Sequence, residues 1–327
     1  MDINTEEENR IILDFSLARI TFLNTPEKEM LSKIIDNADK LALLSVEEIG
    51  QYINRTIGNK AVWDGKKNLQ GAIREFDICR KMKINWLKWT DLEYPVMLKQ
   101  IVNPPYLLFY RGALECFRQK SVSVVGTRKI SAMGKLACLD FSKTASEAGV
   151  CVISGLANGT DSFAHKGCVE AYFNYLDEDK DISFLGKTCA VLPCGIDDIV
   201  PKTNVRLAEG ILQSGGCLIS EYAPLTPMAD WHFVKRNRII AALSPATVII
   251  EAPNGSGALI TADFALELGR AVLFHEVCFS KNAELINESV KKDLDKGFVK
   301  GTVSKHKIES SSLRYVEDGA PVIKDYD

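Results

Sequence analysis

The sequence predicts an α/β protein with a doubly wound, mostly parallel, Rossmann-like sheet and a small helical domain at the N-terminus. Three observations support this prediction. The chain has 327 residues, 46% of them hydrophobic, which is enough for one large α/β domain and a smaller module. Apolar residues recur at helical spacing between Asn9 and Lys83. From Ser121 onward, short apolar runs alternate with helical patterns, as in a parallel sheet.

Residues 1–85 are expected to form the helical domain, similar to a SAM or helix-hairpin-helix domain. Thr25-Pro26 and Ser45-Val46-Glu47-Glu48 have the composition of helix starts, and Glu48 is the acid of a capping box. Helix-hairpin-helix domains bind DNA through a Gly-x-Gly hairpin, which this region lacks. A packing role is therefore favoured for it.

Residues 86–279 are expected to form the extended Rossmann-like domain. The stretch 91–112 contains paired prolines and then a β-like run, and we interpret it as a connector into the main sheet. Ligands of such sheets bind beyond the carboxyl ends of the strands, where loops and helix N-termini present free N–H groups. The six predicted strands are 121–125, 151–154, 188–192, 217–220, 247–251 and 271–275.

Residues 280–327 are expected to form a peripheral tail, with a helix and a strand of unknown use. The N-terminus is acidic and lacks the features of a signal peptide, and no apolar run approaches a membrane-spanning length. These observations predict a cytoplasmic protein without a membrane partner. The formal net charge is −3, so any anion site must be a local cluster of cations.

The nine cysteines show no CxxC spacing, and most lie in apolar surroundings. The closest pair, Cys189 and Cys194, lacks neighbouring partners for a redox or zinc site. We therefore expect reduced core thiols, no metal and no cofactor.

Glycine and small polar residues follow the predicted strands. Glycine lets the backbone approach a ligand closely, and hydroxyl groups add hydrogen-bond donors, so such loops suit phosphates. One loop of this kind is weak evidence, whereas several at the same edge are stronger. The segments in question are Gly126-Thr127-Arg128, 154–161, 193–197, 231–240 and 251–262.

The same motifs, in this order, resemble the DprA/Smf family, also called DNA-processing protein A. The resemblance extends from Glu93-Tyr94-Pro95 to about His275. Its strongest pieces are Val125-Gly126-Thr127-Arg128, Ser154-Gly155-Leu156-Ala157 with Asp161, Ile219-Ser220-Glu221-Tyr222, Arg236-Asn237-Arg238-Ile239-Ile240, and Ser256-Gly257-Ala258-Leu259-Ile260-Thr261-Ala262.

The resemblance implies a non-catalytic protein that binds single-stranded DNA in a basic pocket, forms a homodimer, and loads RecA recombinase on the strand during DNA uptake and recombination in natural transformation. It also implies that Arg128 and Lys202 contact phosphate, and that Arg236 and Arg238 line one pocket. The remaining residues implied to bind DNA or phosphate, or to fix the binding loops, are Gly126, Ser154, Gly155, Asn204, Asn237, Ser256, Gly257 and Thr261.

The sequence departs from the family pattern at several places. Asn158 stands where the family usually has a basic residue, and Thr160 replaces the usual Ile. An acidic insertion occupies 175–182, and Glu276-Val277-Cys278 replaces an expected Pro-Gly. A less basic pocket is the expected consequence.

Other interpretations remain open. Two arginines at i,i+2 leave a helix on different sides, so Arg236 and Arg238 face one phosphate only if the helix begins between them. Asp161 and His165 are either an acid/base pair or a cap with a packed histidine, and the second is favoured. The main rival function is a nucleotide-handling enzyme of the lysine-decarboxylase/LOG type, for which the helix after 251–257 offers Asp263 and Glu267. A mononucleotide sensor is the second alternative.

Overall fold

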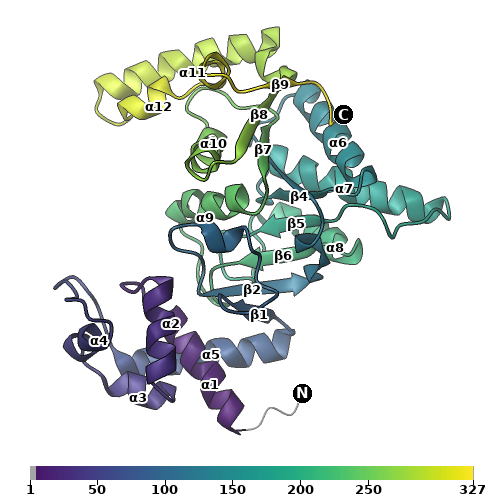
Figure 1. The fold of residues 1–327 in the computed structure, drawn as a ribbon. Coiled ribbons are helices and arrows are strands. Elements are labelled where there is room, and N and C mark those ends of the chain that lie inside the picture. The colour runs from purple at the N-terminus through teal and green to yellow at the C-terminus, as the bar shows by residue number, and fades with distance from the viewer. Residues whose placement is uncertain (1–4, 327) are drawn as a thin grey trace.

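The structure, a computed structural model, describes residues 5–326. Residues 1–4, which begin the acidic N-terminal stretch considered above, and Asp327 lie outside the described residues. The described chain forms a nine-stranded, mostly parallel sheet with helices on both faces and a helical region at the N-terminal end (Figure 1). The predicted fold class is therefore confirmed. None of the described helices combines the length and the hydrophobicity that crossing a bilayer requires.

The N-terminal region is helical, as predicted. Ser45 accepts a hydrogen bond from the Glu48 backbone N–H and the Glu48 carboxylate accepts one from Ser45, which is the predicted capping box. Asn24 and Glu27 form a second capping box at the helix start near Thr25. The helices are α1 (Thr5–Ala18), α2 (Thr25–Ile34), α3 (Ala38–Leu43), α4 (Val46–Tyr52) and α5 (Gly65–Met82).

These helices share a hydrophobic core with one face of the sheet. The ring of Phe15 on α1 lies 5.6 Å from the ring of Phe109, edge to face, and Leu218 belongs to the same buried cluster. Burial of this shared apolar surface fixes the helices against the sheet.

All six predicted strands are present, with small shifts at their ends. They are β3 (Ser121–Val125), β4 (Cys151–Ser154), β5 (Thr188–Val191), β6 (Cys217–Ser220), β7 (Ala246–Ile249) and β8 (Ala271–His275), all parallel to one another. The stretch 91–112 contributes more than a connector, because β2 (Leu107–Gly112) pairs antiparallel with β6. β1 (Asn85–Lys88) pairs with β2 at the sheet edge and was not predicted, since only Leu87 in it is buried.

Side chains of each strand alternate between two hydrophobic cores. Cys189 and Val191 face one core, whereas Ala190 and Leu192 face the other. In Figure 1, α9 (Asp230–Ala242) and α10 (Gly257–Glu267) cover one face of the sheet. The opposite face carries α6 (Ala132–Glu147), α7 (Thr160–Asp177) and α8 (Val205–Gln213).

The strand order places the switch point of the sheet between β3 and β7. The order is β1-β2-β6-β5-β4-β3-β7-β8-β9, so the chain runs outward from β3 to β6 and then crosses back to β7. The helices that follow successive strands change faces at that point and leave a crevice beyond the carboxyl ends of β3 and β7. A ligand site is expected there.

The tail forms helices and a strand, as predicted, and it also supports this crevice. It consists of α11 (Lys281–Val299), α12 (Lys305–Glu309), α13 (Ser312–Glu317) and β9 (Val322–Ile323), which pairs with β8. The Gly255 N–H donates to the Ser310 carbonyl at 2.8 Å, and the Ser312 hydroxyl donates to the Ala252 carbonyl at 3.0 Å. The loop after β7 is thus held by the last part of the chain.

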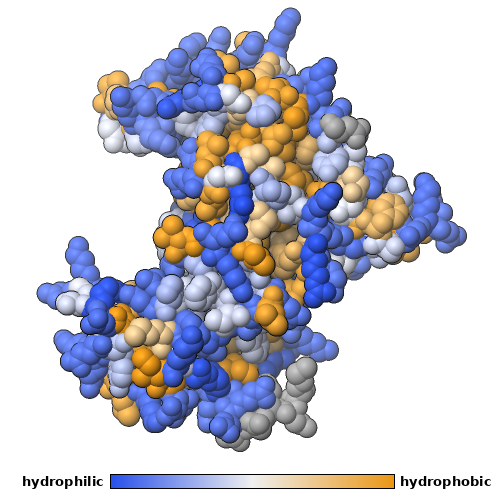
Figure 2. Space-filling view, in the orientation of Figure 1, coloured by the Kyte–Doolittle hydropathy of each residue, from blue (hydrophilic) through white to orange (hydrophobic). Residues whose placement is uncertain are grey.

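Figure 2 shows that hydrophilic residues dominate the outer face of α11 and the far end of α7. Hydrophobic residues gather over the middle of this face of the molecule.

Candidate nucleic-acid interface

A pocket of about 320 Å³ lies at the switch point, and we call it the strand-end pocket. It is built from the loops after β3, β4 and β7 and from the facing surface of α9. Seven of the residues singled out from the sequence line it together: Gly126, Arg128, Arg236, Asn237, Ser256, Gly257 and Thr261.

Three glycines of the motifs serve two different purposes. A Cβ atom on Gly126 would lie 2.7 Å from the Glu251 carbonyl oxygen, and one on Gly155 would lie 2.5 Å from the Arg236 guanidinium. Those two positions need glycine because the protein itself is packed closely around them. A Cβ atom on Gly257 would meet nothing within 4 Å, so that backbone faces open space. Ligand atoms can approach the backbone at Gly257.

Arg236 lies in the wall of the strand-end pocket, with only 2% of its surface exposed. Its guanidinium donates to the Gly155 carbonyl at 2.7 Å and to the Val191 carbonyl, so it joins the loop after β4 to the last residue of β5. Burial lowers the pKa of Arg236 to about 10, and the nearby Asp161 carboxylate opposes that shift. Arg236 therefore remains a cation at neutral pH and acts as a fixed positive charge behind the pocket.

Among the described residues that line the strand-end pocket, Asp161 at the start of α7 is the only acidic one. Burial raises the pKa of Asp161, and the charge of Arg236 partly offsets this effect. Its carboxylate accepts a hydrogen bond of 3.4 Å from the Ala157 N–H. Asp161 thus holds the glycine-containing loop after β4 in place.

Arg128 is the exposed cation of the pocket. Its guanidinium stacks on the ring of Phe233 from α9, 4.5 Å from the ring centroid, which orients it without neutralising its charge. Within residues 5–326 it forms no ion pair with an acidic side chain. This charge remains available for a phosphate.

The N-terminus of α10 forms the opposite wall. Ser256 caps the helix by accepting from the Ala258 N–H at 3.3 Å, and Gly257 is the first helical residue. Asn237 donates to the Gly257 carbonyl at 3.4 Å. Helix N-termini carry partial positive charge and unpaired N–H groups, which favour an anion next to Gly257.

Four other residues implied by the resemblance lie outside the pocket lining. Ser154 is buried and donates to the Val124 carbonyl at 2.6 Å, and Gly155 lies behind Arg236. Asn204 donates to the Leu156 carbonyl at 2.9 Å, so it fixes a loop. Lys202 is exposed on that adjoining loop and pairs with Asp198.

The expectation that Arg236 and Arg238 line one pocket is wrong. α9 begins at Asp230, ahead of both arginines, so an i,i+2 spacing turns their side chains to different sides of the helix. Arg238 is directed away from the strand-end pocket and forms an ion pair with Glu221, with an N···O distance of 2.5 Å. It also donates to the Asn103 carbonyl at 3.1 Å.

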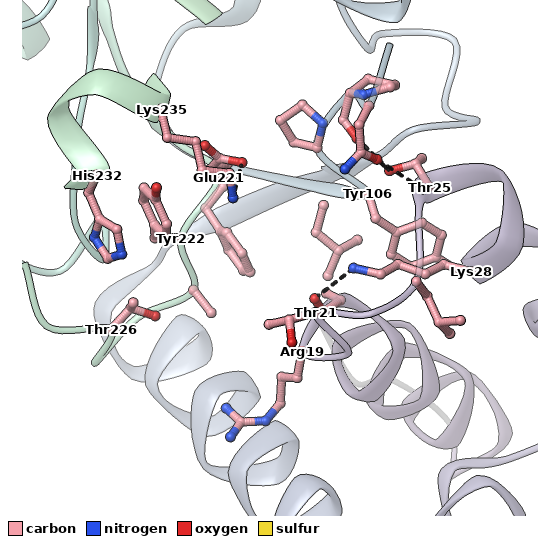
Figure 3. Close-up of a pocket in the computed structure, with 18 of the residues that line it drawn as sticks. Arg19, Thr21, Thr25, Lys28, Tyr106, Glu221, Tyr222, Thr226, His232 and Lys235 are labelled. Carbon is pink, nitrogen blue, oxygen red and sulfur yellow. Dashed lines mark hydrogen bonds and ion pairs between the residues drawn. The ribbon is translucent and has the colours of Figure 1, made fainter. Parts of the chain in front are cut away.

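Arg238 lines a second pocket, of about 410 Å³, between the N-terminal helices and α9. We call it the junction pocket (Figure 3). In Figure 3, the Tyr222 and His232 rings lie side by side, and they stack with centroids 4.0 Å apart. Lys28 enters from α2 and donates to the Ala18 carbonyl at 3.0 Å. Burial lowers the pKa of Lys28 to about 8, and the charge of Lys235 adds to this shift.

Sequence reasoning did not find Phe233, which supports Arg128, or Lys28. Each acts through a partner distant in the chain, so no local spacing indicated its position. In the segment 231–240, Trp231 is exposed, whereas His232 is buried and its Nδ1 lies 3.0 Å from the Pro193 carbonyl.

The acid/base interpretation of Asp161 and His165 is not supported. His165 is fully buried and its Nδ1 lies 2.7 Å from the Thr188 hydroxyl, in the core beneath the pocket. Burial lowers the pKa of His165 to about 3. The rival enzyme's carboxylates are also misplaced, because Asp263 accepts from the Tyr315 hydroxyl and neither Asp263 nor Glu267 lines the strand-end pocket.

Comparison with known proteins shows to which family the chain belongs. The sequence profile of the DNA recombination-mediator protein A family matches residues 85–300, more than half of the chain. The chain belongs to the DprA/Smf family. The matched range holds the whole lining of the strand-end pocket.

Two relatives within the DprA/Smf family illustrate the degree of similarity. Protein Smf of Borreliella burgdorferi is 38% identical over 186 residues, covering 57% of this chain and 55% of the relative. DNA processing protein DprA of Bacillus subtilis is 34% identical over 194 residues, covering 59% of this chain and 61% of the relative. The chain thus matches between about half and three fifths of the length of these curated relatives.

Solved structures of DprA proteins share the fold. DNA processing protein A from Streptococcus pneumoniae aligns with a TM-score of 0.64 over 97% of this chain and 95% of that chain, at 23% identity. The protein from Helicobacter pylori, described for its single-stranded DNA binding mode, aligns with a TM-score of 0.51 over 59% of this chain and 80% of that chain, at 24% identity. At these identities the likeness concerns the fold.

Proposed function

We propose that this chain binds single-stranded DNA in the strand-end pocket and catalyses no reaction. The proposal extends to a cytoplasmic homodimer that loads RecA recombinase on the bound strand during recombination of DNA taken up in natural transformation. Membership of the DprA/Smf family and the single-stranded DNA binding described for the Helicobacter pylori protein support it.

The observation that carries the proposal is the position of Arg128. Its charge is exposed at the switch point, between the N-terminus of α10 and the buried charge of Arg236. The positive charges of Arg128, Arg236 and the helix N-terminus outweigh the single Asp161 carboxylate in the pocket, which favours a phosphate over a neutral ligand.

Fluorescence anisotropy with a labelled oligothymidine, measured across a salt series, tests DNA binding. We expect salt-sensitive binding, because phosphate contacts release counterions from the strand. Arg128→Ala should weaken binding by about tenfold. It should also make the dependence of log affinity on log salt concentration shallower by roughly the amount that one phosphate contact contributes. Arg80→Ala removes an exposed arginine on α5 that also stacks on an aromatic ring but lies in the N-terminal helical region, so it is the matched control and should bind normally. Undetectable binding at low salt would overturn the proposal.

The same assay separates the DNA proposal from the mononucleotide-sensor and enzyme alternatives. A mononucleotide contacts few phosphates, so its affinity changes little with salt, whereas that of a strand falls steeply. Competition by free nucleotides at micromolar concentration would favour the alternatives. If free nucleotides do not displace the oligothymidine, the result favours single-stranded DNA as the ligand.

RecA loading and dimerisation need separate measurements. RecA ATPase activity on DNA covered with single-strand-binding protein should rise when this protein is added, and Arg128→Ala should reduce the rise. Sedimentation velocity should give the mass of two chains, and a monomer at all micromolar concentrations would contradict the homodimer.

A further inference from the structure

Four cysteine thiols meet inside the Rossmann-like domain, at the end of the sheet opposite the strand-end pocket. The sulfur atoms of Cys116, Cys189 and Cys217 all lie within 4.8 Å of one another. Cys151 neighbours Cys116, but its sulfur does not lie within 4.8 Å of all three of the others. All four side chains are fully or almost fully buried, with at most 1% of their surface exposed. We call these residues the thiol cluster.

The topology of the sheet explains this convergence. Cys151 and Cys217 are the first residues of β4 and β6, and Cys189 is the second residue of β5, which lies between those two strands. Cys189 pairs in register with Cys217, so their side chains leave the sheet on the same face. Cys116 comes from the short helix Leu114–Phe117 that follows β2 and contributes to the same hydrophobic core.

The chemistry of the cluster favours a thiophilic cation. The nearby core is apolar, and the group contains only sulfur ligands. Thiolates are soft ligands, and a set of four suits Zn²⁺ in a closed tetrahedral site. With Zn–S bonds of about 2.3 Å, the ligating sulfurs of such a site lie roughly 3.8 Å apart. The sulfurs of Cys116, Cys189 and Cys217 are spaced on that scale, and Cys151 completes the tetrahedral set by moving toward them when the metal binds.

A disulfide explains the cluster less completely. The sulfurs of Cys116 and Cys217 are 2.8 Å apart, well beyond the roughly 2.05 Å of a disulfide bond. A disulfide would also use only two of the four thiols. A shared cation gives all four sulfurs a role and relieves the close approach of unbonded sulfur atoms, which normally stay about 3.5–4.0 Å apart like other heavy atoms.

We propose that Cys116, Cys151, Cys189 and Cys217 bind one structural Zn²⁺ ion. Each thiol releases its proton to solvent when its sulfur binds the metal, so one Zn²⁺ displaces four protons. Because the site is closed, the metal enters as the domain folds.

Metal analysis of the purified full chain tests the proposal directly. We expect about one zinc per chain after expression in zinc-supplemented medium and dialysis without chelator. Growth with cobalt in place of zinc should give the intense sulfur-to-metal charge-transfer band and visible d–d bands of a tetrahedral cobalt thiolate. A folded wild-type chain that contains neither metal overturns the proposal.

Cysteine substitutions locate the metal. Cys189→Ser and Cys217→Ser should lower the zinc content at least fivefold, since a tetrahedral site lacks a ligand in each. Cys138→Ser and Cys168→Ser are matched controls, because those cysteines are equally buried but belong to the core on the other face of the sheet. Equal zinc content in all four variants would overturn the assignment.

Thiol titration of the denatured wild type keeps the test valid where a variant fails to fold. All nine cysteines should react with a thiol reagent in denaturant with chelator, and a mercurial should release zinc from the native chain. Nine reactive thiols without any zinc would indicate plain thiol packing, and two missing thiols with the mass of two hydrogens lost would indicate a disulfide. Either result contradicts the zinc site.

Discussion

The two pockets on either side of α9 both contain several cations, but they use them differently. In the junction pocket, Arg238 and Lys235 share the Glu221 carboxylate, and Arg19 pairs with Glu75. In the strand-end pocket, Arg128 rests on an aromatic ring and faces solvent. Cations that are paired with buried acids mainly hold the structure together, whereas an exposed cation without such a partner can bind an anion.

The comparison also separates the layers of the strand-end pocket. Arg236 is buried and donates hydrogen bonds to backbone carbonyl groups. Arg128, in the loop after β3, is exposed to solvent. The first should affect stability and the second binding. Substitutions in the two layers test this division.

Arg236→Met should destabilise the protein by about 3–5 kcal/mol, because it leaves the Asp161 carboxylate and two carbonyl groups without their buried partner. Urea denaturation followed by circular dichroism measures the change. Lys202→Met, at an exposed lysine, is the control and should change the free energy of unfolding by less than about 0.5 kcal/mol. If Arg236→Met has the same free energy of unfolding as the wild type, the buried contacts of Arg236 do not hold the pocket together.

His165, beneath the pocket, should make the protein less stable at mildly acidic pH. Burial lowers its pKa in the folded state to about 3, from the ordinary value of 6.5. The unfolded chain therefore takes up the proton first, so the stabilisation is complete above pH 6.5 and is lost as the pH falls toward 3. Between pH 7 and 5 the loss from this residue should be about 2 kcal/mol. Urea denaturation at both pH values should give a smaller difference for His165→Gln than for the wild type.

Arg238→Ala should lower the free energy of unfolding by roughly 1–3 kcal/mol, because the buried Glu221 carboxylate loses a charged donor. It should leave the salt slope of DNA binding unchanged. Anisotropy and urea denaturation on the same preparation check both statements. A fall in slope as large as that of Arg128→Ala would mean that the strand also reaches the junction pocket.

Asn158→Lys should raise affinity for oligothymidine by a few-fold and steepen the salt slope by roughly 0.7, the value for one added phosphate contact on a single strand. Asn158 is exposed on the loop after β4 and accepts a hydrogen bond of 3.0 Å from Thr203. Asn158→Gln keeps the side chain neutral and serves as the control in the same anisotropy assay. No gain in affinity would indicate that the bound strand avoids this loop.

The sequence predicted the six parallel strands because each is a short, largely buried apolar run bounded by turn residues and separated from the next by a helical pattern. Parallel strands bring their carboxyl ends to one edge, which predicted where a ligand site would lie, and the family resemblance supplied seven of the residues that line the strand-end pocket but not Phe233. The sequence did not predict β1, whose pairing depends on β2, or the thiol cluster, whose members are adjacent only across strands. The different directions of Arg236 and Arg238 followed from helix geometry once the helix start was known.

The attachment of the tail to the loop after β7 also affects the order of events during synthesis. Domains begin to fold from the N-terminal end while the chain is still being made. Ser310 and Ser312 hold the loop that leads to Gly257, and β9 pairs with β8, so these contacts form only after residues 310–323 have been synthesised. A nascent chain that has not yet reached Ser310 lacks the hydrogen bonds that hold this wall of the strand-end pocket.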